Sequence, residues 1–344
     1  MALPAAYPAE PSARDRFILA RRWQRPARDP WQHQGVLVER EPEARGQGIT
    51  SATVFLTGRE CPWRCVMCDL WQYTLEHDTP PGAVAAQVRD AVASLRGRSE
   101  TAWPAQIKLY NAGSFFDPRA VPDADYDAIA EALRPFDRVV VESHPALVGP
   151  RLRAFIAACR RAAGGDGPAV EVAMGLETAH PDALARLNKR TSLAQFEAAA
   201  AAIRGAGASL RAFVLVGVPF IPRQEQQAWV QRSIAAARAC GARLVSLIPL
   251  RRGNGAIETL ERTGDVVVPG LTDLEDALDA ALATRAERTA DTTLVCVDTW
   301  NLEALTDCAA CHGTRVDRLR AMNLTQQVRP RVPCHACDRG SAVS

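Results

Sequence analysis

The segment Cys61-Pro-Trp-Arg-Cys65-Val-Met-Cys68 has three cysteines at C-x3-C-x2-C spacing, directly after the apolar run Ile49–Leu56. Iron–sulfur clusters are held by cysteine thiolates, and a 4Fe–4S cluster with four cysteine ligands is fully ligated. Three thiolates leave one iron open for an exchangeable ligand, just as catalytic metal sites keep an open coordination position. We therefore interpret Cys61, Cys65 and Cys68 as the catalytic ligands of a 4Fe–4S cluster.

A structural zinc knuckle is the alternative interpretation of the same segment. It would take its fourth ligand from elsewhere in the chain, for example from His77. Structural zinc sites favour C-x2-C pairs, which makes this alternative the weaker one.

Length and composition describe an ordinary soluble globular protein, with 344 residues, a net charge of +2 and 47% hydrophobic residues. This length suits one large α/β domain with appendages. No apolar run reaches the roughly 18 residues of a membrane span, and the N-terminus lacks a secretory apolar core. We expect a cytoplasmic protein without membrane contact. Its ten cysteines then indicate metal or redox sites rather than disulfides.

Short apolar runs alternate with amphipathic helical patterns between residues 49 and 298. Each run is bounded by glycine or proline, as expected of buried parallel strands. The predicted strands are Thr50–Leu56, Gln106–Tyr110, Arg138–Val141, Ala169–Met174, Leu210–Val216 and Arg243–Ile248, with a seventh at Thr293–Val297. This alternation predicts a parallel sheet with right-handed crossovers.

The position of the unusual motifs separates a barrel from a doubly wound sheet, which periodicity alone leaves open. The cysteine segment follows the first strand, Asn111-Ala-Gly-Ser114 follows the second, and Gly175-Leu-Glu-Thr178 follows the fourth. Barrel enzymes build their sites from such loops, whereas a doubly wound sheet gathers ligand contacts near one switch point. We predict an α/β fold, a partial (β/α)6 TIM-like barrel over residues 49–298.

Two appendages flank the predicted barrel. Residues 1–48 form an N-terminal arm, which we expect as a short arm or helix over the main domain; its arginines and aromatic residues could also contact RNA phosphates. Residues 299–344 form a small C-terminal module.

The C-terminal module contains the pairs Cys308-x2-Cys311 and Cys334-x2-Cys337. Such paired C-x2-C knuckles predict a metal site, occupied either by zinc or by a fully ligated auxiliary 4Fe–4S cluster. The arginine-rich segment between the two pairs is either a solvated basic loop or a surface that faces nucleic acid.

The motifs taken together resemble the radical S-adenosylmethionine (SAM) superfamily from Cys61 to Leu260. The resemblance implies that the cluster binds SAM and cleaves it reductively, with an electron donor such as flavodoxin or ferredoxin. The resulting 5′-deoxyadenosyl radical would abstract hydrogen from a substrate. Polar groups of the protein would hold and orient the cofactor.

The resemblance also implies which residues contact SAM. Asn111, Gly113 and Ser114 occupy the place of the family's GGE motif, which contacts the SAM amino group, although the glutamate of that motif is absent here. Glu177 would reach the ribose, and the backbone of Met67 would contact adenine. Val216, at the end of the fifth strand, completes the predicted cofactor contacts.

More narrowly, the stretches NAGSFFD, ESHP, EVAMGLET and LNKR are similar to the family of the archaeosine synthase radical SAM subunit and related bacterial Fe–S oxidoreductases. That similarity implies a modified nucleoside in tRNA as substrate. A small molecule or peptide from a biosynthetic pathway is the alternative substrate. A non-catalytic, metal-stabilised RNA-binding protein is the alternative from another functional class.

Overall fold

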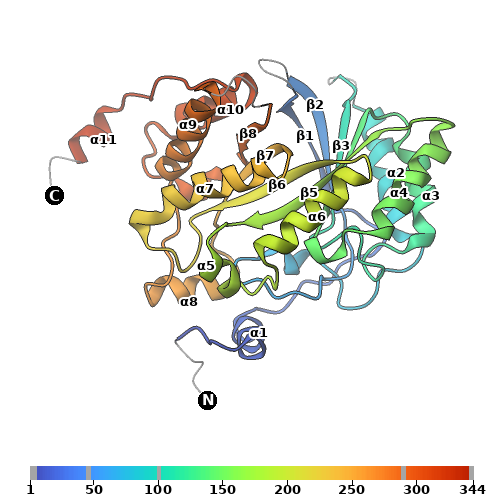
Figure 1. Cartoon of the computed structure of the whole chain (residues 1–344), viewed down its shortest axis with the longest axis horizontal. Helices are drawn as coiled ribbons and strands as arrows, with labels where there is room; N and C mark the ends of the chain where they lie inside the picture. Colours follow the sequence, from blue (N-terminus) through green and yellow to red (C-terminus); the bar gives the residue numbers. More distant parts are fainter. Residues whose placement is uncertain (1–5, 44–47, 99–101, 288–291, 341–344) are drawn as a thin grey trace.

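A computed structural model describes residues 6–43, 48–98, 102–287 and 292–340. One eight-stranded sheet runs through the molecule in the order β1 to β8 (Figure 1). β1 pairs antiparallel with β2, and all later neighbours are parallel. The strands are β1 (Gly35–Pro42), β2 (Gly48–Phe55), β3 (Gln106–Tyr110), β4 (Arg138–Ser143), β5 (Ala169–Glu177), β6 (Ser209–Val216), β7 (Ala242–Pro249) and β8 (Leu294–Val297).

The sheet is curled into an open barrel, since β1 and β8 lie at its two ends and are not paired with each other within the described residues. Helices follow the parallel strands and cover its outer face (Figure 1). The described helices, including α1 before the sheet and α11 near the C-terminus, are α1 (Pro11–Leu19), α2 (Ala83–Arg96), α3 (Tyr126–Leu133), α4 (Pro150–Ala163), α5 (Pro181–Arg186), α6 (Leu193–Gly205), α7 (Gln226–Ala239), α8 (Ala256–Arg262), α9 (Leu271–Glu287), α10 (His312–Thr325) and α11 (His335–Gly340).

The predicted partial barrel is confirmed, and each of the seven predicted strands is present. Parallel order follows from the crossovers, because a helix between consecutive strands returns the chain to the same end of the sheet. The main core lies between the outer face of the sheet and the helices, where Val54, Leu109 and Phe155 are fully buried. The division into arm, barrel and C-terminal module stays a prediction.

Strand β1 is an element that the sequence reading did not predict. Val36 and Val38 pack against the main core, while Glu39 and Glu41 bond to Lys108 inside the barrel. Half-buried strands are recognised by apolar residues at every second position. In β1 the residues that point into the barrel include the charged Glu39 and Glu41, so this pattern is interrupted. The strand therefore becomes recognisable only when its partners across the barrel are known.

Helix α1 lies over the main domain, which confirms the expected arm or short helix. Phe17 and Ile18 are buried in a second apolar cluster that includes Val66 of the cysteine segment and Leu187. The N-terminal segment thus supports the loop that carries the three cysteines.

The barrel interior is filled at one level by ion pairs. Arg211 on β6 bonds to Glu41 at 2.8 Å and to Glu171 on β5 at 2.6 Å, and Lys108 on β3 bonds to Glu41. Burial alone would raise the pKa of Glu171, but Arg211 and Arg243 outweigh it and lower the pKa to about 2. Breaking such a pair would leave a buried charge without a partner. This network forms a layer of buried ion pairs across the barrel interior.

Candidate functional site

The three cysteines predicted as cluster ligands lie together at the edge of the sheet where the parallel strands end. Cys61, Cys65 and Cys68 all line a cavity of about 650 Å³. Three thiolates on one loop can each bind a different iron of a multi-iron cluster. The donor set and its setting therefore fit a 4Fe–4S cluster.

Two asparagines fix the backbone of the cysteine segment. Asn188 donates from Nδ2 to the carbonyl of Arg64 at 2.7 Å, and Asn254 donates to the carbonyl of Val66 at 2.7 Å. Asn188 lies in the LNKR stretch, and Asn254 lies between two glycines, Gly253 and Gly255. The role of the two asparagines became visible only in three dimensions. They hold the loop between the cysteines in one conformation before any ligand binds.

The cavity walls are mostly apolar and rich in aromatic rings. They come from both ends of the sheet, since β1 contributes Val36 and Leu37, and the segment after β8 contributes Asp298 and Trp300. The aromatic lining residues are Phe55, Trp63, Tyr73, Tyr110, Phe213 and Trp300. Ligand sites commonly combine such apolar walls with a few convergent polar groups.

Three of the predicted SAM contacts line this cavity, and three do not. Met67, Gly113 and Glu177 line it. Ser114 is buried and bonds to Ser143, whereas Val216 lines a different, smaller pocket beside Gly217. Asn111 is buried, and in the described structure its side-chain amide has no hydrogen-bond partner. The contacts of all six residues with SAM stay predictions.

Glu177 forms an ion pair with Lys189 at 2.5 Å, a partner that the sequence reading did not assign. The backbone of Glu177 is left-handed, with φ of 63°. A Cβ at Gly175 would lie 2.1 Å from both Glu177 Oε1 and Lys189 Nζ, so any larger residue there would displace the pair. The pair presents a fixed carboxylate and ammonium group at the cavity wall.

Glu142, at the end of β4, is a site residue that sequence reasoning missed. Its Oε1 accepts the backbone N–H of Asn111 at 2.7 Å and that of Gly113 at 3.3 Å, and Glu142 also lines the cavity. Burial raises the pKa of Glu142 to about 7, against these N–H groups, which lower it. The backbone N–H of Ala112 also bonds to this carboxylate and lowers its pKa. A carboxylate so placed is suited to a positively charged group of a ligand.

His144 stacks on Trp63 of the cysteine segment, with ring centroids 3.5 Å apart and planes at 11°. Its Nε2 lies 2.9 Å from the carbonyl oxygen of Lys189. Burial lowers the pKa of His144 to about 3, so the ring is neutral at physiological pH. His144 therefore holds Trp63 in place rather than supplying a positive charge.

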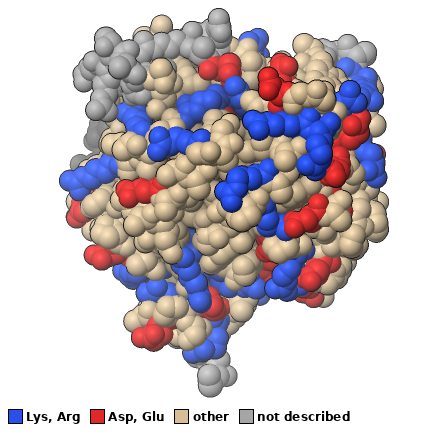
Figure 2. All heavy atoms as spheres, turned by 45° about the vertical axis from the view of Figure 1, so that its right-hand side comes forward, with Lys and Arg blue, Asp and Glu red and all other residues tan. Residues whose placement is uncertain are grey.

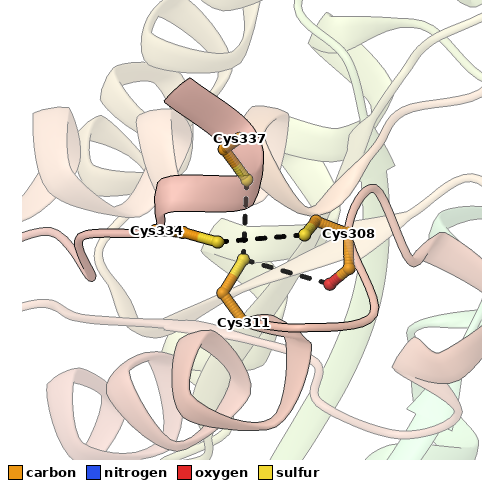
Figure 3. Close-up of side chains that lie close together, drawn as sticks. All are labelled: Cys308, Cys311, Cys334 and Cys337. Carbon is orange, nitrogen blue, oxygen red and sulfur yellow. Dashed lines mark hydrogen bonds between the residues drawn. The ribbon is translucent and has the colours of Figure 1, made fainter. Parts of the chain in front are cut away.

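The four C-terminal cysteines form a second site, apart from the cavity. The sulfurs of Cys308 and Cys334 are 3.9 Å apart, and those of Cys311 and Cys337 are 3.7 Å apart (Figure 3). All four sulfurs lie within 4.8 Å of one another. The predicted gathering of these residues into one possible metal site is confirmed.

Several arginines of the two arginine-rich segments pair with acidic residues of the same chain. In the N-terminal segment, Arg22 and Arg25 bond to Glu60, and whether the other arginines of this stretch contact RNA phosphates stays a prediction. The segment between the cysteine pairs is mainly helix α10 rather than the expected basic loop, and its Arg315 and Arg318 are buried against Glu275. Positive and negative side chains are also interspersed on the face seen in Figure 2.

No protein-family model and no curated protein matches this chain. Solved structures match at low identity. The radical SAM methyltransferase TsrM from Kitasatospora setae is 16% identical over 61% of this chain and 39% of its own, with a TM-score of 0.41. Archaeal Elp3 from Methanocaldococcus infernus is 11% identical over 69% of this chain and 59% of its own, with a TM-score of 0.49.

Coproporphyrinogen III oxidase (HemN) from Escherichia coli, described as a radical SAM enzyme, is 15% identical over 79% of this chain and 55% of its own, with a TM-score of 0.44. The chain thus spans 39% to 59% of the length of these three proteins. At such identities and TM-scores, the barrel assignment depends on this chain's own sheet. Among its described helices, none is long and apolar enough to cross a membrane.

Proposed function

We propose that this chain is a radical SAM enzyme. The observation that carries the proposal is the convergence of Cys61, Cys65 and Cys68 on one cavity at the carboxyl ends of parallel strands. When bound there, a 4Fe–4S cluster supplies one electron that breaks the S–C5′ bond of SAM, giving methionine and a 5′-deoxyadenosyl radical. An electron donor such as flavodoxin or ferredoxin would supply the electron, and the radical would abstract a hydrogen atom from the substrate to give 5′-deoxyadenosine.

The residues around the cavity would bind and orient the cofactor. Glu142 offers its carboxylate at the cavity wall to an ammonium group, and Glu177 offers its carboxylate to hydroxyl groups while Lys189 neutralises it. Asn188 and Asn254 keep the cysteine loop in place. Apolar walls exclude water, which protects a carbon radical from side reactions.

The residues of the cavity walls also favour a substrate with a compact, apolar or aromatic part. Phe55, Tyr110 and Phe213 offer ring faces and edges for such a group. Arg22, Arg315 and Arg318, expected to face phosphates, pair with acidic residues of the same chain, which weakens the charge argument for tRNA. We therefore place a small molecule first. A modified nucleoside in tRNA, which the sequence resemblance implies, is the second candidate.

Anaerobic reconstitution with iron and sulfide, followed by addition of dithionite and SAM, tests the proposed reaction. Chromatography should detect 5′-deoxyadenosine and methionine in equal amounts. A reconstituted protein with a verified 4Fe–4S spectrum that forms neither product would contradict the enzyme proposal. That result would favour the non-catalytic alternative.

A gel shift with total tRNA over a range of salt concentrations separates the two substrate candidates. Phosphate contacts make affinity fall steeply as salt rises. We expect no shift even at about 50 mM salt, where phosphate contacts are strongest. A salt-sensitive shift would restore tRNA as the first candidate.

A further inference from the structure

We propose that Cys308, Cys311, Cys334 and Cys337 bind a single zinc ion, and that this ion fixes helix α10 in the gap of the open barrel. The proposal concerns a site apart from the cavity and does not depend on the proposed reaction. It has two parts, the identity of the metal and its structural role.

The spacing of the sulfur atoms indicates the metal. Zinc binds four thiolates in a tetrahedron with Zn–S bonds of about 2.3 Å, which places neighbouring sulfurs about 3.8 Å apart. The measured separations are 3.9 Å for Cys308–Cys334 and 3.7 Å for Cys311–Cys337. A 4Fe–4S cluster binds each thiolate on a different iron, so its sulfurs surround a four-iron core and lie farther apart. The compact group in Figure 3 therefore fits one ion.

The two cysteine pairs lie on either side of α10. Cys308 and Cys311 precede the first residue of the helix, His312, while Cys334 and Cys337 lie beyond its end, around the start of α11. An ion bound by all four thus joins the chain before α10 to the chain after it. Four protein ligands also leave no open position, as in structural zinc sites.

Helix α10 contacts both ends of the curled sheet, β1 and β8. Its side chains bond to the free edge of β8 as another strand would. Asn323 accepts the N–H of Val297 at 2.9 Å and donates to its carbonyl at 2.8 Å. Gln326 does the same to Val295, at 2.9 and 2.7 Å. An edge strand otherwise leaves such groups unpaired, so α10 closes the barrel where the sheet does not.

Buried charge ties α10 to α9 next to the cysteines. Arg315 and Arg318 both bond to Glu275, whose side chain is only 2% exposed. If α10 moved away, Glu275 would lose both of these arginines and keep only the longer contact to Arg331 at 3.4 Å, which is unfavourable for a buried charge. Correct placement of α10 is therefore important for the whole C-terminal region, and the ion restrains the chain at both ends of the helix.

The position of α10 also matters for the cavity. Val36 and Leu37 on β1, together with Asp298 and Trp300 after β8, are cavity-lining residues. By holding β1 and β8 in place, α10 supports two opposite parts of the cavity wall. The zinc ion would thus shape the site without taking part in its chemistry.

Metal analysis of anaerobically purified protein tests the identity of the ion. We expect one zinc per chain in addition to cluster iron, and loss of that zinc in the Cys308→Ala/Cys334→Ala variant with the cluster iron retained. Cys240→Ala, a buried thiol outside both sites, is the matched control and should keep both metals. A protein with about eight irons and no zinc would overturn the assignment.

Amide hydrogen exchange tests the structural role. In the zinc-free variant, the amides of Val295 and Val297 should exchange about tenfold faster or more, while those of the central strand β5 stay protected. Asn323→Ala should expose the amide of Val297 with zinc still bound, which separates edge capping from metal binding. If the variant does not fold, brief chelation of wild-type zinc provides the same comparison. Unchanged protection of β8 after zinc loss would overturn the role of the ion.

Discussion

The chain has two cysteine sites that differ in number, spacing and surroundings. Cys61, Cys65 and Cys68 line an open cavity, whereas the four C-terminal cysteines lie within 4.8 Å of one another, apart from the cavity. A set of three thiolates beside a cavity leaves room for a reactive ligand. A complete, compact set of four excludes one. The comparison shows that the number of ligands and their surroundings separate a reactive site from a structural one.

The two sites also differ in what keeps them in place. The cysteine loop at residues 61–68 is fixed by Asn188, Asn254 and the packing of α1, so its shape does not require a metal. At the C-terminal site, the proposed ion itself joins distant parts of the chain. Loss of metal should therefore affect chemistry at the first site and structure at the second.

The largest expected effect comes from Cys65→Ala. Removal of one of only three thiolates should abolish both cluster binding and SAM cleavage, while the C-terminal zinc stays at one per chain. Iron and zinc analysis together with the 5′-deoxyadenosine assay measure this. Cys159→Ala, a buried thiol in α4, is the control and should keep both metals and the activity. Retention of cluster and cleavage by Cys65→Ala would contradict the assignment of the loop.

Glu177→Gln should weaken SAM binding by about 1–3 kcal/mol, because a charged hydrogen-bond acceptor is lost and Lys189 is left without its partner. Equilibrium dialysis of the reconstituted protein measures the affinity. Glu261→Gln, which removes a Glu–Arg pair at the surface of α8, is the matched control and should bind SAM as the wild type does. Equal affinity in the Glu177 variant and the wild type would show that Glu177 does not contact the cofactor.

SAM affinity should also fall about tenfold between pH 8 and pH 6, because the ionised fraction of Glu142 falls about tenfold around its pKa of about 7. Glu142→Gln should bind weakly at both pH values and lose this dependence. The same raised pKa stabilises the folded protein below the ordinary glutamate pKa, and that contribution is lost as pH rises through about 7. Binding that does not change with pH in the wild type would argue against an ammonium contact at Glu142.

The smallest expected effect is that of Asn254→Ala. Its Oδ1 accepts the N–H groups of Ala256 and Ile257 at the start of α8, and loss of such a cap costs about 1 kcal/mol of stability. Chemical denaturation measures the change. Cluster iron should bind less tightly while zinc is unaffected, because Asn254 also holds the cysteine loop. A lower zinc content instead would show that the two sites are not independent.

Local sequence patterns were sufficient to predict the parallel strands, the partial barrel and the location of both cysteine groups. Strand periodicity and C-x3-C-x2-C or C-x2-C spacing depend on residues close together in the chain. The positions of the motifs after strand ends were sufficient to predict that Met67, Gly113 and Glu177 lie at one site, and all three line the cavity. Val216 does not line that cavity but its neighbour Leu215 in β6 does, because side chains of neighbouring residues in a strand point to opposite faces. Asn111 and Ser114, in the loop after β3, are buried away from it.

Tertiary structure decided which charges are available and how the barrel closes. In the sequence, the arginine-rich segments suggest a surface that binds phosphates. In the folded chain, Arg22, Arg315 and Arg318 pair with acidic residues that lie far away in the sequence. Glu142 becomes a site residue only because the Asn111 loop reaches its carboxylate from the neighbouring strand. The sequence by itself thus determined the fold class and the metal-binding groups, because their signals are local. The cavity, the position of the Glu142 carboxylate and the contacts of α10 with β1 and β8 depend on distant residues, which only the folded chain brings together.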